Sequence, residues 1–409
     1  MESRRRTGHP SRTRVQGPLA AHADGFRREM TARGYSETQV REHVKLAARL
    51  SSWLEGCGLA AQDLAVQRIA EFLAVRSGQA GRGLSTGRGL DPLLGYLRAL
   101  GVVPEPGGQI PATPAEALLE EYGSYLRSRQ GLAPATVALY LYWAKALAGW
   151  LDGLDGATMA ALSAGQVTDF VVAEVRRRNR AQAKSMVTAL RSLLRFLHAA
   201  GHVPRPLAAA VPSVPGWRAR DLPRAAAPGQ IAAVLAACDR RSAAGRRDYA
   251  IILAQVRLGL RAAEVAAIGL ADINWPAGEL TVRGKGGRTD ILPLPADVGG
   301  AVVDYLRHSR PRTPARHLFT GVTAPFSGLG SRAITEIVAR ACDRAGIARF
   351  GSHRLRHALA CQLLAEGASL AEIGQLLRHA SERTTAEYAK AGQARLAGLA
   401  MPCPQGAAR

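Results

Sequence analysis

The sequence predicts a mainly α-helical chain with one small antiparallel β-sheet, and three observations lead to this fold class. Apolar residues recur at helical spacing through most of the chain, as in Leu139, Leu141, Trp143, Leu147 and Trp150. One short region instead reads as strands separated by Pro/Gly turns. At 409 residues the chain also exceeds what one hydrophobic core usually supports, so two or three domains are expected.

Two similar helical modules are predicted in the first half of the chain, after a flexible basic tail over residues 1–24. Gly34 and the pair Trp53-Leu54 recur 97 residues later as Gly131 and Trp150-Leu151. The stretch from Leu97 to Pro104 recurs as Leu197 to Pro204. We therefore predict modules at residues 25–105 and 114–205, with the first a candidate duplicate of the second.

Pro/Gly-rich segments separate the modules, and a linker is expected over residues 206–224. The last domain, residues 225–409, is expected to be helical except for one three-stranded antiparallel meander. Its strands are Ile273 to Trp275, Glu279 to Arg283 and Thr289 to Leu294, with turns at Pro276-Ala277-Gly278 and at Gly284 to Gly287.

The net charge of +22 favours a nucleic-acid partner, because excess positive charge attracts polyanions without regard to sequence. The cysteines show no CxxC spacing, so neither a disulfide framework nor a zinc site is expected, and a reducing cytoplasm fits. No signal peptide and no apolar run of about 18 residues is found, so no membrane role is expected.

His353 and Arg356 are spaced to lie on one face near the start of a helix, with Ser352 as its expected N-cap. There they could bind one phosphate together, because helix N-termini also favour anions. Downstream, one capping box starts at Ser369 and another at Thr384, in the helix bearing Tyr388. His379 would then end one helix, and Tyr388 would lie early in the next.

Two further residues precede these clusters. Arg261 lies three positions before Glu264, a spacing that lets the carboxylate orient the guanidinium. Lys285 lies at a hairpin tip between glycines, which permit close approach of the backbone to a ligand, and its amine could deliver a proton to a leaving oxygen. A tyrosine preceded by His/Arg clusters suits a chain whose own hydroxyl attacks a phosphodiester.

Together these motifs resemble the tyrosine recombinase, or phage integrase, family. The likeness rests on Leu258-Gly259-Leu260-Arg261 followed by Glu264, the Gly284-Lys285-Gly286 hairpin, His353-x-x-Arg356-His357, and His379 followed nine residues later by Tyr388. It covers about residues 224–391, and residues 118–204 resemble the family's helical core-binding domain more weakly. Together with the internal repeat, the resemblance predicts tandem all-helical SAM-like DNA-binding modules before a mixed α/β catalytic domain.

The resemblance also implies a role for each matching position. Arg261 and Arg356 would clamp the scissile phosphate, and Lys285 would protonate the departing 5′ oxygen. His353 would assist proton transfer, His379 would hydrogen-bond the phosphate, and Tyr388 would form a 3′-phosphotyrosyl link. Since that link keeps the phosphoester energy, no metal, ATP or other cofactor is expected.

Two departures from the family pattern stand out. Arg378 replaces a small residue, commonly Gly, beside the site, and we expect it to contact the DNA backbone. The first helical module is not the small β-rich arm-binding domain of many phage integrases, so its target is left open between a longer DNA footprint and a partner recombinase.

Further DNA contacts are expected from basic residues outside the site. These are Arg176, Arg177, Arg178 and Arg180 beside a helix of the core-binding domain, and Arg332 near the start of a helix that could enter a groove.

The leading interpretation is a site-specific recombinase acting on double-stranded DNA as a homo-tetramer on paired sites, alone or with partner recombinases. A cytoplasmic, nucleoid-associated bacterial protein of mobile-element origin is expected. The alternatives are a relaxing type IB topoisomerase and a catalytically silent DNA-binding regulator. A metal-dependent nuclease is disfavoured, because no acidic cluster with ligand spacing accompanies the motifs.

Overall fold

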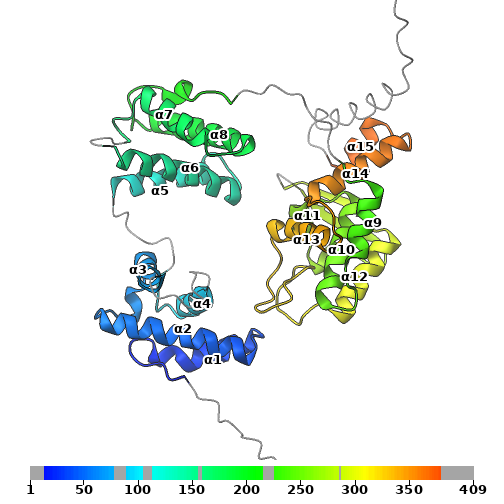
Figure 1. The fold of residues 1–409 in the computed structure, drawn as a ribbon, viewed down its shortest axis with the longest axis horizontal. Coiled ribbons are helices and arrows are strands. Elements are labelled where there is room, and N and C mark those ends of the chain that lie inside the picture. Colours follow the sequence, from blue (N-terminus) through cyan, green and yellow to red (C-terminus); the bar gives the residue numbers. More distant parts are fainter. Residues whose placement is uncertain are drawn as a thin grey trace, which may run out of the picture. The chain divides into compact units, whose positions relative to one another are not determined.

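The computed structural model describes residues 13–77, 89–104, 113–154, 159–214, 225–284 and 287–378 (Figure 1). Contacts divide the chain into two compact units, Pro104–Ala219 and the rest. Three large and separate hydrophobic clusters hold the two helical modules and the carboxy-terminal domain. The predicted fold class is confirmed, since the structure is mostly helical with one three-stranded sheet. Within the described ranges, no helix combines the length and apolarity that a bilayer crossing needs.

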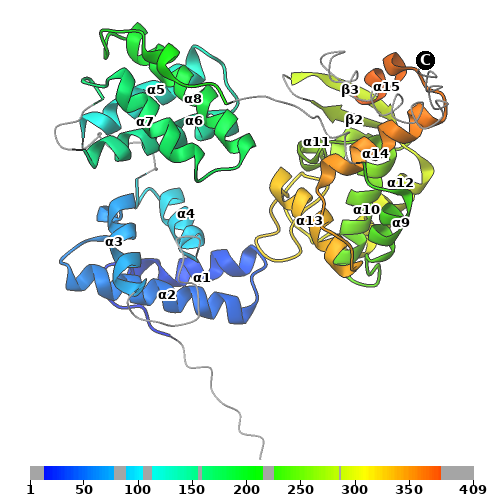
Figure 2. The same cartoon turned by 45° about the horizontal axis from the view of Figure 1, so that its top comes forward.

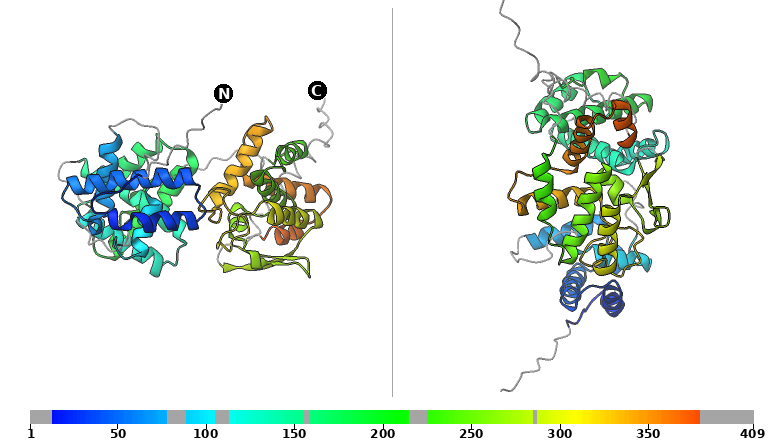
Figure 3. Two further views of the ribbon diagram at one scale, coloured as in Figure 1. Left: turned by 90° about the horizontal axis from the view of Figure 1, so that it is seen from below. Right: turned by 90° about the vertical axis from the view of Figure 1, so that its right-hand side faces the viewer.

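Among its described residues, the amino-terminal module packs four helices around its own core, and the first two of them run side by side (Figures 1 and 3). They are α1 (Ala23–Ala32), α2 (Glu37–Gly56), α3 (Val66–Ser77) and α4 (Asp91–Ala99). Val15 and Leu19 are buried in the same core, so the predicted tail boundary at residue 24 is too late. These two apolar side chains, four positions apart, anchor the segment that leads into α1.

The second helical module, for which the name core-binding module is kept from the resemblance, likewise has four helices among its described residues (Figure 2). They are α5 (Pro114–Ser128), α6 (Pro134–Asp152), α7 (Ala164–Val175) and α8 (Arg180–Ala199). Its core also takes in Leu207 and Val211, and the carbonyl oxygen of Val211 accepts a hydrogen bond from Arg191 at 2.9 Å. The predicted linker therefore begins too early, because the first part of that proline-rich segment is packed on this module.

The sequence repeat corresponds to equivalent local structure in the two modules. Gly34 and Gly131 both take left-handed φ angles, 82° and 57°, before α2 and α6 respectively. Gly101 and Gly201 do the same after α4 and α8, at 70° and 78°. Such positions suit glycine, which lacks the Cβ that disfavours a left-handed backbone. The repeated glycines therefore mark turns that both modules share.

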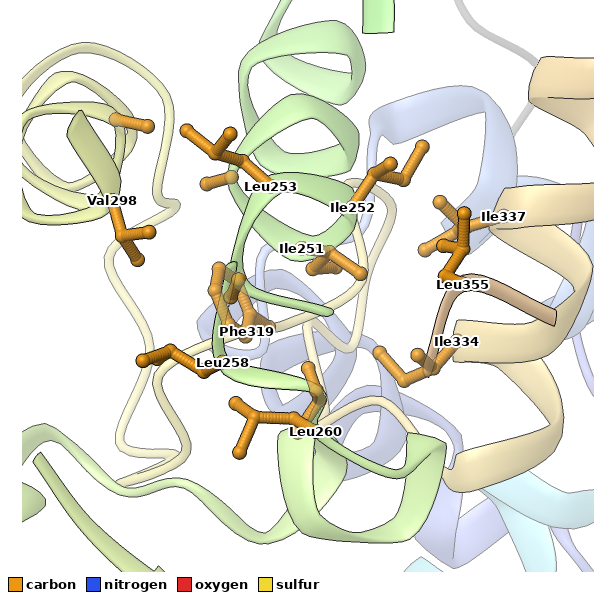
Figure 4. Close-up of a cluster of buried hydrophobic side chains, with 14 of the residues drawn as sticks. Ile251, Ile252, Leu253, Leu258, Leu260, Val298, Phe319, Ile334, Ile337 and Leu355 are labelled. Carbon is orange, nitrogen blue, oxygen red and sulfur yellow. The ribbon is translucent and has the colours of Figure 1, made fainter. Parts of the chain in front are cut away.

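The carboxy-terminal domain is built around α10 (Ala243–Leu258), a helix buried along most of its length (Figure 4). Ile251, Leu253 and Leu258 project from it into a core completed by Phe319 and Leu355. The other helices of this domain are α9 (Pro228–Ala236), α11 (Ala262–Ala267), α12 (Ala296–His308), α13 (Ser331–Arg344), α14 (Ser352–Ala365) and α15 (Leu370–Leu376).

The sheet is the predicted meander, with strands β1 (Ile273–Asn274), β2 (Glu279–Arg283) and β3 (Thr289–Pro293) in the order β1-β2-β3. β1 pairs with β2 through Ile273 and Leu280, and β2 pairs with β3 through Arg283 and Thr289. β2 also contacts α11 (Figure 2). This packing fixes the base of the β2–β3 hairpin next to the helix that follows Arg261.

Candidate active site

Arg261 lies in the short turn that joins α10 to α11. α10 ends at Leu258 and is capped by Gly259, whose φ of 59° is left-handed, and α11 begins directly after Arg261, its N-cap residue. The Glu264 carboxylate accepts the backbone N–H of Arg261 at 2.9 Å and its guanidinium at 2.6 Å. This pair is the one expected from the three-residue spacing. The Arg261 side chain is 37% exposed, so it lies at the surface of the domain. One edge of its guanidinium group is bonded to the Glu264 carboxylate.

Glu264 is a buried carboxylate, with only 4% of its side chain exposed. Burial alone would raise its pKa, but the backbone N–H of Arg261 and the charges of Arg378 and Arg261 outweigh that effect, so the pKa of Glu264 lies below its ordinary value. Glu264 therefore stays ionised and acts as a fixed negative anchor for the guanidinium groups around it.

Arg356 extends from the second turn of α14 into the domain and is 1% exposed. Its guanidinium donates to the carbonyl oxygen of Gly259 at 2.5 Å and also to that of Leu377. Gly259 precedes Arg261 by two residues, and Leu377, the C-cap of α15, directly precedes Arg378. Arg356 therefore ties the turn bearing Arg261 to the end of α15.

The two guanidinium groups converge on one short segment. Arg261 approaches the carbonyl oxygen of Arg378 at 3.5 Å, and Arg356 donates to the carbonyl oxygen of the preceding residue, Leu377. Because carbonyl groups of consecutive residues lie within a few ångströms of each other, Arg261 and Arg356 belong to one site and do not face opposite surfaces.

His353 lies on the first turn of α14 and is exposed, whereas Arg356 is buried. The three-residue spacing puts the two positions about 60° apart around α14, so they lie on one side of the helix although their exposure differs. The His353 ring packs edge-on against that of His357, with centroids 4.2 Å apart. The expected N-cap is wrong by one position, since Gly351 caps α14 and Ser352 is its first residue. His353 still stands where helix N-terminal N–H groups favour an anion.

Arg378 occupies a left-handed position, with a φ of 53°, directly after α15. Its guanidinium donates to Glu264 at 2.8 Å and to the carbonyl oxygen of Leu376 at 3.0 Å. Its side chain is 5% exposed. The expected contact with the DNA backbone does not fit this arrangement, because the guanidinium points inward to a buried carboxylate.

The hairpin that carries Lys285 is fixed at its base. Arg283, the last residue of β2, donates to both carboxylate oxygens of Asp272 at 2.5 and 2.7 Å, and the Gly284 N–H donates to the carbonyl oxygen of Arg288 at 2.7 Å. Hydrogen bonds from Arg283, stronger than the opposing effect of burial, hold the pKa of Asp272 below its ordinary value. Lys285 itself lies outside the described residues, as do His379 and Tyr388.

The described residues of the site carry a net positive charge. Three guanidinium groups, from Arg261, Arg356 and Arg378, are gathered near one carboxylate, Glu264. If Glu264 is assigned to neutralise one of them, two positive charges stay in excess. Such a fixed arrangement suits a phosphodiester, whose negative charge increases as a nucleophile adds to phosphorus.

Three of the predicted DNA-contact residues of the core-binding module lie between α7 and α8, and the fourth, Arg180, is the first residue of α8. Arg176, Arg177 and Arg180 are exposed, whereas Arg178 is half-buried, pairs with Glu174 at 3.1 Å and lies over the Trp143 ring. Arg332 is exposed near the start of α13.

A basic stripe that was not predicted from the sequence continues along α8. Helical geometry places Arg180, Lys184, Arg195 and His198 within about 60° of one another, and all four are exposed. α8 contains no acidic residue. The spacing of these basic residues by multiples of a helical turn was the available signal. On α4 the position equivalent to Arg195 is Gly95, so the amino-terminal module does not repeat the stripe.

Comparison with known proteins gives this geometry a context. The profile described as the phage integrase family matches residues 226–395. A Sinorhizobium fredii protein named as integrase/recombinase y4rA is 38% identical over 394 residues, covering 95% of this chain and 95% of that protein. Tyrosine recombinase XerD of Xanthomonas axonopodis pv. citri is 31% identical over 294 residues, covering 67% of this chain and 93% of that protein.

Solved structures share the fold at low sequence identity. The XerH site-specific recombinase bound to a palindromic difH substrate superposes with a TM-score of 0.56 at 17% identity, covering 81% of this chain and 93% of that one. A lambda integrase dimer bound to a core site gives a TM-score of 0.52 at 19% identity, covering 66% and 94%. By sequence and by fold, the chain belongs to the phage integrase family of tyrosine recombinases, which cleave and rejoin DNA strands.

Proposed function

We propose that this chain is a site-specific recombinase in which Tyr388 attacks the scissile phosphate and forms a 3′-phosphotyrosyl link. The observation that carries the proposal is the convergence of Arg261 and Arg356 on the consecutive carbonyl groups of Leu377 and Arg378, immediately before His379. A phosphate bound there would meet two guanidinium groups at once, as stabilisation of its growing charge requires.

Each residue of the site has a distinct proposed role. Arg261, at the rim, binds a non-bridging oxygen, and Arg356 holds the other oxygen from the interior, where a charge is less screened than in water. Lys285 protonates the departing 5′ oxygen, while His353 and His379 assist proton transfer and hydrogen-bond the phosphate. Attack by a 5′ hydroxyl of a second strand reverses the step, so strand exchange needs neither ATP nor a metal ion.

We propose that the basic stripe on α8, together with the exposed Arg176 and Arg177 beside it, binds the DNA backbone outside the active site. We further propose a homo-tetramer on paired sites. Two solved structures of one relative support this assembly, since lambda integrase is described as a dimer on a core site in one and as a tetramer on a Holliday junction in the other.

The decisive experiment traps the covalent intermediate. The full-length protein is incubated with nicked suicide duplexes taken from the DNA flanking its own gene, with EDTA present, and adducts are resolved by denaturing electrophoresis. We expect an adduct that is lost in Tyr388→Phe and kept in Tyr142→Phe, a matched change of an exposed tyrosine in the core-binding module.

An adduct that survives in Tyr388→Phe would reject this nucleophile, and an adduct that forms only with magnesium would reject the metal-free mechanism. The topoisomerase alternative predicts relaxation of any supercoiled plasmid, whereas a recombinase needs its own site. A silent regulator would bind the site and form no adduct.

A further inference from the structure

Arg378 occupies a backbone conformation that an arginine rarely adopts. It follows the C-cap of α15 with a φ of 53°, and its N–H donates to the carbonyl oxygen of Gln375 at 2.9 Å. This post-helical, left-handed position is most often filled by glycine, because a Cβ there crowds the backbone. An arginine at this point is strained, so its side chain must make interactions that offset the strain.

Those interactions lie inside the domain. Arg378 donates to the Oε2 atom of Glu264 at 2.8 Å, and the two side chains are 5% and 4% exposed. The same Oε2 atom accepts the backbone N–H of Arg261, while Oε1 accepts the Arg261 guanidinium. Glu264 therefore accepts a hydrogen bond from Arg378 and, through both of its oxygen atoms, also fixes the position of Arg261.

The main chain of Arg378 contacts the same network a second time. Its carbonyl oxygen lies 3.5 Å from the Arg261 guanidinium, and the neighbouring carbonyl, of Leu377, accepts from Arg356. The backbone dihedral angles at residue 378 therefore set the directions of the carbonyl groups of Leu377 and Arg378. Side chain and backbone of one residue thus constrain both guanidinium groups of the proposed phosphate site.

We propose that Arg378 is a positioning residue: it locks the Glu264 carboxylate, and with it the turn after α15, so that Arg261 is held ready for the scissile phosphate. This proposal rests on the proposed strand-cleavage function. Arg378 does not touch DNA and acts only through Glu264 and through its own carbonyl group.

Single-turnover kinetics separate positioning from DNA contact. Cleavage of the suicide duplex is measured at saturating protein, and the dissociation constant is measured by fluorescence anisotropy at several salt concentrations. In Arg378→Gly, which relieves the backbone strain, we expect cleavage about 10- to 100-fold slower, because small misplacements of catalytic groups have effects of this size. The dissociation constant and its salt dependence should stay within twofold of the wild type.

Coupling to Glu264 provides the readout that a merely structural residue would not give. Arg378→Gly should have little further effect on cleavage in a Glu264→Gln background, because both changes break the same link. Arg378→Lys, which keeps the charge, should recover part of the rate. Arg378→Asn tolerates a left-handed backbone and repeats the test if the glycine variant folds poorly. The matched control is Arg349→Ala, which breaks an exposed pair with Asp343 in the same domain and should cleave at the wild-type rate.

Three results would overturn the proposal. They are wild-type cleavage by Arg378→Gly, multiplicative losses in the double variant, or weaker binding with a salt slope reduced by about one, which would make Arg378 a phosphate contact. If the wild type forms no adduct, or the adduct survives Tyr388→Phe, the proposed function fails and this proposal fails with it. If a Tyr388 adduct forms and Arg378→Gly cleaves normally, only the role of Arg378 is rejected.

Discussion

Replacing Gly259 by alanine should displace the residues that position Arg261 and Arg356. Gly259 caps α10 with a φ of 59°, and a Cβ built on it would lie 2.7 Å from Cδ2 of Leu377 and 3.0 Å from Cδ2 of Leu359. Its carbonyl oxygen accepts from Arg356, and Arg261 follows two residues later. An added methyl group therefore strains the backbone and displaces Leu377, whose carbonyl group is the other anchor of Arg356.

The structure allows the two effects to be separated. A left-handed backbone costs an L-residue about 1–2 kcal/mol, and overpacking a buried position typically adds about 1–3 kcal/mol. Gly278, in the turn between β1 and β2, has a φ of 65°, and a Cβ there would meet nothing within 4 Å. Gly278→Ala therefore carries only the backbone cost, and the difference between the two variants isolates the packing cost.

Native-state hydrogen exchange of the α14 amides is a suitable assay, because it reports on this domain alone within a multidomain chain. With each 1.4 kcal/mol equal to a factor of about ten, Gly278→Ala should speed exchange by about one order of magnitude. Gly259→Ala should speed it by between about one and a half and three and a half orders. Cleavage of the suicide duplex should slow in Gly259→Ala and stay unchanged in Gly278→Ala.

Equal acceleration in both variants would show that the two leucine side chains move aside without cost. Wild-type cleavage by Gly259→Ala would show that this turn does not set the position of Arg261. Either result would refute the reasoning from packing at Gly259.

Three more predictions concern the hairpin, the pH response and the DNA grip. Arg283→Ala removes the bidentate pair with Asp272 and should slow cleavage about tenfold without changing the dissociation constant, measured by single turnover and anisotropy. The lowered pKa values of Glu264 and Asp272 stabilise the fold above the ordinary carboxyl range. Resistance to urea should therefore hold at neutral pH and fall below about pH 4, and Asp272→Asn should weaken that fall. Arg195→Ala should lower the slope of log affinity against log salt by about 0.9, whereas Arg41→Ala, paired with Glu37 on α2, should leave it unchanged.

Local spacing in the sequence was enough to predict several parts of the site. The three-residue step from Arg261 to Glu264 predicted an ion pair that the structure places at 2.6 Å. The capping box at Ser369 predicted the start of α15, and two glycine turns predicted the meander. These features depend on neighbours in the chain, whose geometry a helix turn or a hairpin fixes directly.

Features that depend on distant contacts were not predictable in the same way. The partner of Arg378 lies 114 residues earlier, and no local pattern connects the two. Arg356 is buried because the ends of α10 and α15 offer it carbonyl groups, which its spacing from His353 does not reveal. Val15 and Val211 likewise lie in segments of loop-like composition, and only packing places them inside a core.

The burial of Glu264 explains how so many like charges can share one site before DNA arrives. Three guanidinium groups this close would repel one another, and a single ionised carboxylate shared between Arg261 and Arg378 offsets that repulsion while it fixes their geometry. It cannot neutralise all three, so a phosphate that enters the site relieves what is left. DNA binding should therefore stabilise this domain beyond the effect of surface contacts, and that extra stabilisation should decrease in Arg261→Gln, which removes a positive charge proposed to contact the phosphate. Differential scanning fluorimetry with and without the duplex measures both shifts, and an equal or larger shift in the variant would contradict this account of the charge balance.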